Sequence, residues 1–144
     1  MPRMRPALGT VLLCFICLPT LTPQQSSLTP CSQEGIIHVN NLLNSTLNMN
    51  RLGCKLYTPT VIDYENCPRD TLKCFADEVK VIILELNTVP EVTRRLYSIL
   101  NSLSKRFNES KSACPQCECH KEEKAEIFLR NLLKTLQRMN NEHC

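Results

Sequence analysis

Two cysteine pairs constrain this chain more than any other feature of its sequence. Cys67 and Cys74 lie near the start of one amphipathic pattern, and Cys114 and Cys117 lie just before another. Two such pairs allow a helix and a loop to be cross-linked at two parallel points. This arrangement suits a small, rigid extracellular helical domain much better than an enzyme, because disulfides persist in oxidising compartments.

A leader at the N-terminus predicts that compartment. Arg3 and Arg5 precede an apolar run over residues 7–18, which is the pattern of a signal peptide. The run is shorter than the roughly 20 residues that span a bilayer, and an uncleaved anchor is the alternative. We expect residues 1–22 to be removed, give or take several residues, and residues 23–144 to form one domain.

Removing the leader also changes the charge and the cysteine count. The formal charge falls from +3 to about +1 without the two leader arginines, and no basic block remains to indicate a nucleic-acid partner. Cys14 and Cys17 leave as well, so eight of the ten cysteines remain. An even number of cysteines in a secreted domain predicts a disulfide framework, but eight of them allow on the order of a hundred pairings.

Two asparagines are candidates for N-glycosylation, which also fits secretion. Asn44 and Asn108 each begin an Asn-x-Ser/Thr sequon, the acceptor motif for N-glycans. Sequons also arise by chance. We favour Asn108 because it falls in a predicted loop.

Apolar residues at helical spacing predict four helices. They cover about residues 33–49, 68–87, 90–107 and 121–140, with a long crossover and a short extended piece in 50–67. The second and third helices are joined by two residues and must be antiparallel neighbours. The other two connections are long enough to run the length of a helix. Long, short and long connections predict an all-α, short-chain four-helix bundle with up-up-down-down topology.

Four segments of the chain carry a family resemblance. They are Leu56-Tyr57-Thr58, Lys73-Cys74-Phe75, the Cys114-x-x-Cys117-Glu118 motif, and the run of leucines in 128–139 that ends in Gln137-x-Met139. In these segments the chain resembles the interleukin-15 family, within the interleukin-2, -15 and -21 group of common-gamma-chain cytokines. The resemblance extends from about Ile36 to Cys144, and the first predicted helix aligns most loosely.

The resemblance implies two of the disulfides. In this family the pairs that correspond to Cys67–Cys114 and Cys74–Cys117 tie the loop after the third helix to the start of the second. The remaining cysteines of the mature chain lie outside that pattern.

Geometry assigns the other four cysteines. In an up-up-down-down bundle, the first helix begins and the last helix ends at the same pole. Cys31 and Cys144 flank those two ends, so we predict a Cys31–Cys144 bond. That leaves Cys54 and Cys119 as the fourth pair.

The function implied by the resemblance is receptor assembly. Such a secreted cytokine binds an alpha receptor, here the interleukin-15 receptor alpha chain or a relative. It then brings together the interleukin-2 receptor beta and common gamma chains, which activates kinases inside lymphocytes in an immune response. The implied protein catalyses no reaction, needs no cofactor and no metal, does not insert into a membrane, and is a monomer before receptor binding.

Individual residues carry the implied alpha-receptor contacts. They are Tyr57, Glu78, Glu85 and Glu118. Glu78 and Glu85 are seven residues apart and project from the same side of a helix, and Glu118 follows a cysteine that the family bridges to that helix. Grouped carboxylates of this kind steer a basic partner and speed association. The alternative is that these residues are ordinary solvated helix charges.

The other two receptor chains have weaker matches. Gln137 corresponds to the family glutamine that contacts the common gamma chain. The alternative is that Gln137 is an ordinary polar residue on the exposed side of its helix. For the beta chain, the family has an acid on the first helix where this chain has Val39, Asn40 or Asn41, and we take Asn40 as the candidate. Glu91 matches a family acid, and Arg95 replaces an expected asparagine. These departures indicate an altered beta-chain affinity or a divergent receptor pairing.

Other functions fit the sequence less well. The ligand types in Cys114, Cys117, Cys119 and His120 suit zinc, but a zinc site would deprive the other cysteines of their partners. An enzyme lacks support because the three histidines are scattered, and bridged cysteines offer no thiolate nucleophile. The main alternative is a secreted, disulfide-rich helical lipid carrier or membrane-active protein. A lipid carrier needs an apolar lumen, whereas the apolar stripes of these helices are expected to fill one packed core.

Overall fold

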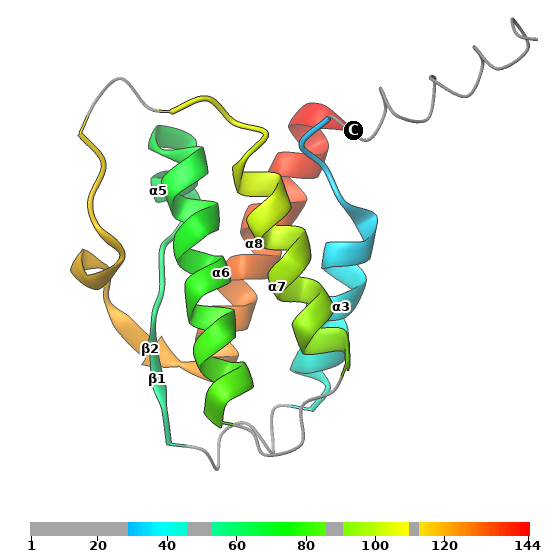
Figure 1. The fold of residues 1–144 in the computed structure, drawn as a ribbon, viewed down its shortest axis with the longest axis vertical. Helices are drawn as coiled ribbons and strands as arrows, with labels where there is room; N and C mark the ends of the chain where they lie inside the picture. Colours follow the sequence, from blue (N-terminus) through cyan, green and yellow to red (C-terminus); the bar gives the residue numbers. More distant parts are fainter. Residues whose placement is uncertain (1–28, 46–52, 86–90, 110–112) are drawn as a thin grey trace, which may run out of the picture.

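Four long helices lie side by side in the computed structural model, which describes residues 29–45, 53–85, 91–109 and 113–144 (Figure 1). The helices are α3 (Gln33–Leu43), α6 (Pro68–Glu85), α7 (Glu91–Ser104) and α8 (Ala125–His143). Helices α3 and α6 run in one direction, and α7 and α8 run in the other (Figure 1). The predicted up-up-down-down bundle is therefore confirmed. The predicted signal peptide lies outside the described residues.

Local sequence signals explain where these helices begin. Ser32 is the N-cap of α3, and its hydroxyl accepts a hydrogen bond from the Gly35 N–H at 2.9 Å, which satisfies one of the free amides of the first turn. Pro68 opens α6, where its missing N–H costs nothing. The acidic residue Asp70 lies in the first turn of α6, where its negative charge complements the helix dipole.

One apolar core holds the helices together. Phe75 of α6 and Phe128 of α8 are fully buried at its centre, with ring centroids 5.4 Å apart. Burying each such ring stabilises the fold by about 1.5–3 kcal/mol. The core residues that join them from the four helices include Val39, Leu72, Val79, Ile82, Leu96, Leu100, Leu129, Leu132, Leu136 and Met139. The stripes predicted from helical spacing thus meet in a single packed core.

The crossover before α6 contains more structure than predicted. Strand β1 (Lys55–Tyr57) is the expected extended piece, but the short helix α5 (Val61–Asn66) was not predicted. Thr60 caps α5 in a reciprocal capping box with Asp63, a signal that is visible in the sequence. The buried ring of Tyr64 then anchors α5 to the bundle.

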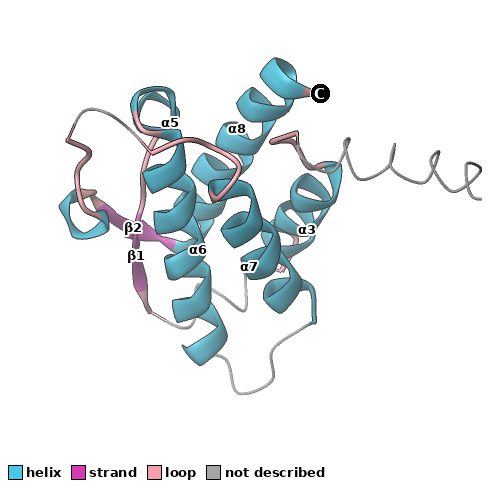
Figure 2. Cartoon of the chain, turned by 45° about the horizontal axis from the view of Figure 1, so that its top comes forward, coloured by secondary structure: helices cyan, strands magenta, loops and turns pink. Residues whose placement is uncertain are grey.

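Strand β2 (Glu122–Lys124) pairs antiparallel with β1, and the two strands lie beside α6 (Figure 2). The last helix was predicted to begin at residue 121, and this prediction is wrong. It begins at Ala125 because the preceding residues pair with Lys55–Tyr57 instead of forming a first helical turn. Hydrogen bonding across the strands satisfies backbone groups that the sequence pattern assigned to the helix.

Three disulfides reinforce the bundle. They are Cys31–Cys144, Cys67–Cys114 and Cys74–Cys117. The first lies at the pole where α3 begins and α8 ends, where Ser32 and Asn140 also exchange two hydrogen bonds of 2.9 and 3.1 Å. The other two tie the loop before β2 to the start of α6. All three pairings agree with the expectations from the sequence.

The expected fourth disulfide, Cys54–Cys119, does not form, and both thiols are free. The strand register explains why. Lys55 is opposite Lys124 and Tyr57 is opposite Glu122, so Cys54 lies beyond one end of the ladder and Cys119 beyond the other. About six strand residues, or roughly 20 Å, separate those positions along the strand. A disulfide needs Cα atoms within about 7 Å.

The described residues also bear on two alternatives. None of their helices is long and apolar enough to cross a membrane. Among the same residues, no group of three or more His, Cys, Asp or Glu side chains is placed to hold a metal ion. Of the ligands considered for zinc, Cys114 and Cys117 are in disulfides, and His120 lies 3.6 Å from a carboxylate oxygen of Asp63.

Candidate functional site

Glu78 is the centre of a group of acidic side chains beside β1. Its side chain projects from α6 toward the strand and is only 8% exposed. One carboxylate oxygen accepts a hydrogen bond of 2.7 Å from the Tyr57 N–H, which points away from β2. Glu78 therefore fixes β1 against α6. The sequence placed Glu78 on an outward surface, whereas the structure makes it a mostly buried tether.

The surroundings of Glu78 favour its protonated form. Burial is the main cause that raises the pKa of the Glu78 carboxyl, and the hydrogen bond from Tyr57 opposes it. The negative charges of Asp77, Glu122 and Glu118 raise the pKa of Glu78 further. Several carboxylates thus act on one another at this point of the surface.

The same group of carboxylates also acts on the phenol of Tyr57. The pKa of the Tyr57 phenol is raised, first by the negative charge of Glu122 and then by burial and a hydrogen bond to Glu122. Glu122 lies directly opposite Tyr57 in the two-stranded ladder. Glu122 was missed in the sequence because a non-local strand pairing brings it to this position.

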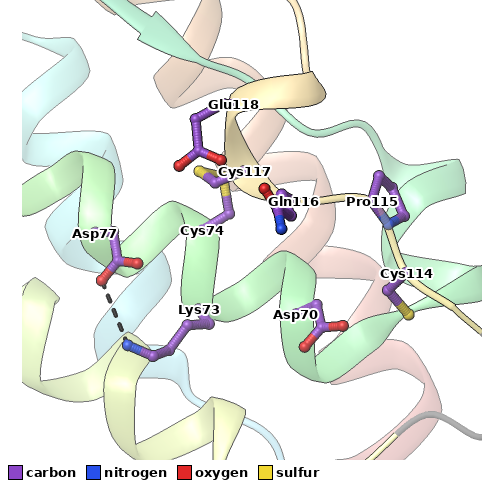
Figure 3. A pocket seen from close by; sticks show the side chains of 9 residues that line it. All are labelled: Asp70, Lys73, Cys74, Asp77, Cys114, Pro115, Gln116, Cys117 and Glu118. Carbon is purple, nitrogen blue, oxygen red and sulfur yellow. Dashed lines mark ion pairs between the residues drawn. A yellow bond between two sulfur atoms is a disulfide. The ribbon is translucent and has the colours of Figure 1, made fainter.

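A disulfide brings Glu118 to the same surface. Glu118 follows Cys117 in the short 3₁₀ helix η2 (Cys117–Cys119), and Cys117 is bonded to Cys74 of α6. Figure 3 shows Glu118 above this disulfide, at the edge of a groove of about 390 Å³. Asp77 lies across from Glu118 and forms an ion pair of 3.5 Å with Lys73.

We call Tyr57, Glu78, Glu85, Glu118 and Glu122 the acidic surface. Tyr57, Glu78, Glu118 and Glu122 interact directly or through their charges. Glu85 is exposed at the end of α6, two turns or roughly 10 Å further along the helix. The structure therefore brings three of the four predicted alpha-receptor residues together and places the fourth at one end of the surface.

A second candidate surface lies between α3 and α7. Arg95 of α7 is exposed there, and Asn40 of α3 and Glu91 of α7 are also exposed. The Arg95 Nε–H donates a hydrogen bond of 2.6 Å to Glu34 of α3, and the same carboxylate oxygen lies 3.1 Å from His38 Nε2. The hydrogen bond from Arg95, and then that from His38, lowers the pKa of Glu34. Sequence analysis missed Glu34.

The remaining predicted residues lie on the surface. Gln137, the predicted gamma-chain residue, is exposed on α8. Asn108 is exposed in the loop after α7, and Asn44 is exposed at the C-cap of α3. A glycan on either asparagine would project into solvent. Glycosylation and receptor contacts stay predictions.

The fold and these surfaces define a class of protein. Four helices with two long crossovers, joined by disulfides and carrying charged outer surfaces, have the architecture of a helical cytokine. The family model described as Interleukin 15 matches residues 12–141, and the chain belongs to this family. Its members are secreted cytokines rather than enzymes.

One curated relative shows how far this chain has diverged. It is similar to interleukin-15 of Felis catus, with 25% identity over 116 residues, covering 78% of this chain and 71% of the relative. No solved structure matches the chain. The match to the family model, rather than this identity, establishes the family.

Proposed function

We propose that this chain is a secreted cytokine that binds an alpha receptor of the interleukin-15 type through its acidic surface. It then brings together the interleukin-2 receptor beta and common gamma chains, or their relatives, and so activates kinases in lymphocytes. The observation that carries the proposal is the acidic surface itself. Its carboxylates come from α6, η2 and β2 and are held together by the Cys74–Cys117 disulfide and the Glu78–Tyr57 hydrogen bond.

The acidic surface has the properties that fast, specific binding requires. Carboxylates clustered on one side of a nearly neutral protein attract a basic partner over distance and increase the association rate. The covalent link from α6 to η2 holds Glu118 in place before binding. Less conformational entropy is then lost on association, which favours affinity.

Two further surfaces complete the proposed assembly. Gln137 on α8 contacts the common gamma chain, and Asn40, Glu91 and Arg95 contact the beta chain. These contacts lie on helices other than α6, so the alpha receptor leaves them accessible. Because neighbouring surfaces of one rigid bundle hold the beta and gamma chains, they are brought close enough for their kinases to act on each other.

Secretion is part of the same proposal. Residues 1–22 are removed as a signal peptide, and Asn108, and with lower preference Asn44, carries a glycan. The lipid-carrier alternative requires an apolar lumen between the helices. The apolar stripes instead pack against one another in one core, which favours the cytokine.

Co-expression with a soluble receptor tests the proposal. The chain is expressed with and without the interleukin-15 receptor alpha ectodomain of the same species, and the complex is purified and applied to lymphocytes. We expect copurification, and phosphorylation of signalling proteins at low concentrations of the complex. Absence of both the complex and the response would rule out the proposed function, and copurified lipid would favour the carrier.

A further inference from the structure

A groove of about 370 Å³ lies between α3 and α7, on a different side of the molecule from the acidic surface. We call it the arginine groove because Arg95 of α7 and Arg106, in the turn directly after α7, line it. Between them it is lined by the hydroxyls of Ser98 and Ser102, and on the α3 side by Glu34. Hydroxyl and guanidinium donors thus outnumber carboxylate acceptors along its length.

Arg95 is held in position for binding by its neighbours. Glu34 accepts a hydrogen bond from the Arg95 Nε–H, and His38 contacts the same oxygen. No other hydrogen bond of this guanidinium is found within the described residues. Its two terminal nitrogens, which form the fork that pairs with a carboxylate, are therefore available to a ligand. Glu34 is a positioning residue for Arg95.

Arg106 marks the other end of the groove. One terminal nitrogen donates to the Thr29 carbonyl at 3.0 Å, and the other lies 3.5 Å from the Ser102 hydroxyl. These contacts fix the side chain along the groove without neutralising its charge, because both partners are uncharged. Arg94 of α7 and Lys105, in the turn directly after α7, are exposed and make the surroundings more positive.

We propose that the arginine groove receives a carboxylate side chain of the receptor chain that docks on α3 and α7. This inference rests on the proposed function and specifies the chemistry of the beta-chain contact. Two arginines and a single carboxylate, that of Glu34, line the groove. At this contact the chain therefore supplies the cation, and the receptor supplies the anion.

The lining of the groove favours a protein side chain over a sulfated glycan. Glu34 would repel a polyanion that followed the groove, but it leaves room for one carboxylate at the outer face of Arg95. Ile99 contributes an apolar wall, and Ile37, three residues after Glu34 on α3, is 56% exposed. Apolar contacts beside a charge pair are typical of protein interfaces.

Binding of the soluble beta-chain ectodomain to the preformed complex of this chain with the alpha ectodomain tests the inference. We expect Arg95→Glu and Arg106→Glu each to weaken beta-chain binding by about tenfold or more. Arg94→Glu is the matched control, with the same charge change on the same helix but outside the groove, and should weaken binding by less than about threefold. Arg95→Gln avoids repulsion from Glu34 and should still weaken binding. Retained alpha-receptor binding shows that each variant is folded.

Salt dependence separates a direct contact from a structural role. Association of the wild-type complex should slow as salt rises, whereas association of Arg95→Glu should become faster as repulsion is screened. Equal effects of Arg94→Glu and Arg95→Glu, or no effect of either arginine, would overturn the inference. Loss of heparin binding in these variants with unchanged beta-chain binding would also overturn it, in favour of a glycan. If the wild-type complex binds no beta chain, the proposed function fails and the inference fails with it.

Discussion

The acidic surface and the arginine groove are built by different means. The acidic surface is fixed by a disulfide and by a buried carboxylate that binds the backbone of β1. The arginine groove is spanned by an exposed ion pair between Glu34 and Arg95, whose side chains are 43% and 59% exposed. One surface is thus held by strong local constraints, and the other by a contact of the kind that contributes little to stability.

This difference teaches how one small bundle can serve several partners. A surface that is locked before binding loses little entropy when it binds, which favours a tight contact. A surface held by exposed side chains can adjust to its partner. Single substitutions there can change its specificity with little effect on the free energy of unfolding.

Removing disulfides gives the largest effect and separates the two regions. Cys74→Ser with Cys117→Ser should lower the free energy of unfolding by about 2–4 kcal/mol and weaken alpha-receptor binding, because η2 is released from α6. The control is Cys31→Ser with Cys144→Ser, which should destabilise the protein by a similar amount and leave alpha-receptor affinity unchanged. Urea unfolding and binding kinetics measure both. Equal effects on affinity would contradict the account.

Substitutions of Glu78 test its role as a tether. Glu78→Ala leaves the Tyr57 N–H without its acceptor and should lower the free energy of unfolding by about 1–3 kcal/mol. Glu78→Gln keeps an acceptor oxygen and removes a buried charge, so it should cost much less. Urea unfolding gives both values. Equal destabilisation by the two variants would show that the charge, rather than the hydrogen bond, is what matters.

Stability should depend on pH with opposite sign in the two regions. The raised pKa of Glu78 means that the folded protein takes up a proton above 4.5, the ordinary value, so this group adds stability as pH falls toward that value. The lowered pKa of Glu34 means that its contribution is present above 4.5 and is lost as pH falls further. The free energy of unfolding is measured from neutral to acidic pH. Glu78→Gln should remove the gain in stability as pH falls toward 4.5, and Glu34→Gln should remove the loss of stability at lower pH. Unchanged profiles would contradict these assignments.

The free thiols give the smallest effect on stability. Cys119 is exposed and should react quickly with a maleimide, whereas Cys54 should react slowly, because burial and the charge of Glu85 raise the pKa of its thiol. Cys119→Ser should change the free energy of unfolding by no more than about 0.5 kcal/mol. Mass spectrometry of the labelled protein identifies the reactive residue. A Cys54–Cys119 bond in secreted material would contradict the strand register.

The sequence was sufficient for the features that depend on local patterns. Apolar spacing predicted all four long helices, and the connection lengths predicted their directions. The position of Cys31 and Cys144 at the ends of the bundle then followed from topology alone. The capping box that begins α5, between Thr60 and Asp63, was equally local and could have been recognised.

Contacts between distant segments could not be predicted in this way. The pairing of β1 with β2 moved the start of α8, separated Cys54 from Cys119 and brought Glu122 opposite Tyr57. Helical spacing placed Glu78 on the outer side of its helix, but the strand that covers it is 21 residues earlier in the chain. The ion pair from Glu34 to Arg95 spans 61 residues. No periodic pattern contains such information.

The central claim is that the acidic surface binds the alpha receptor, and its most direct test is the association rate of the soluble interleukin-15 receptor alpha ectodomain. The wild-type chain should form a complex, with an association rate that falls as salt rises. Glu118→Lys should slow association by about tenfold, whereas Arg95→Gln, on the other surface, should change it by less than about twofold. Absence of a complex, or equal effects of these two variants, would contradict the account.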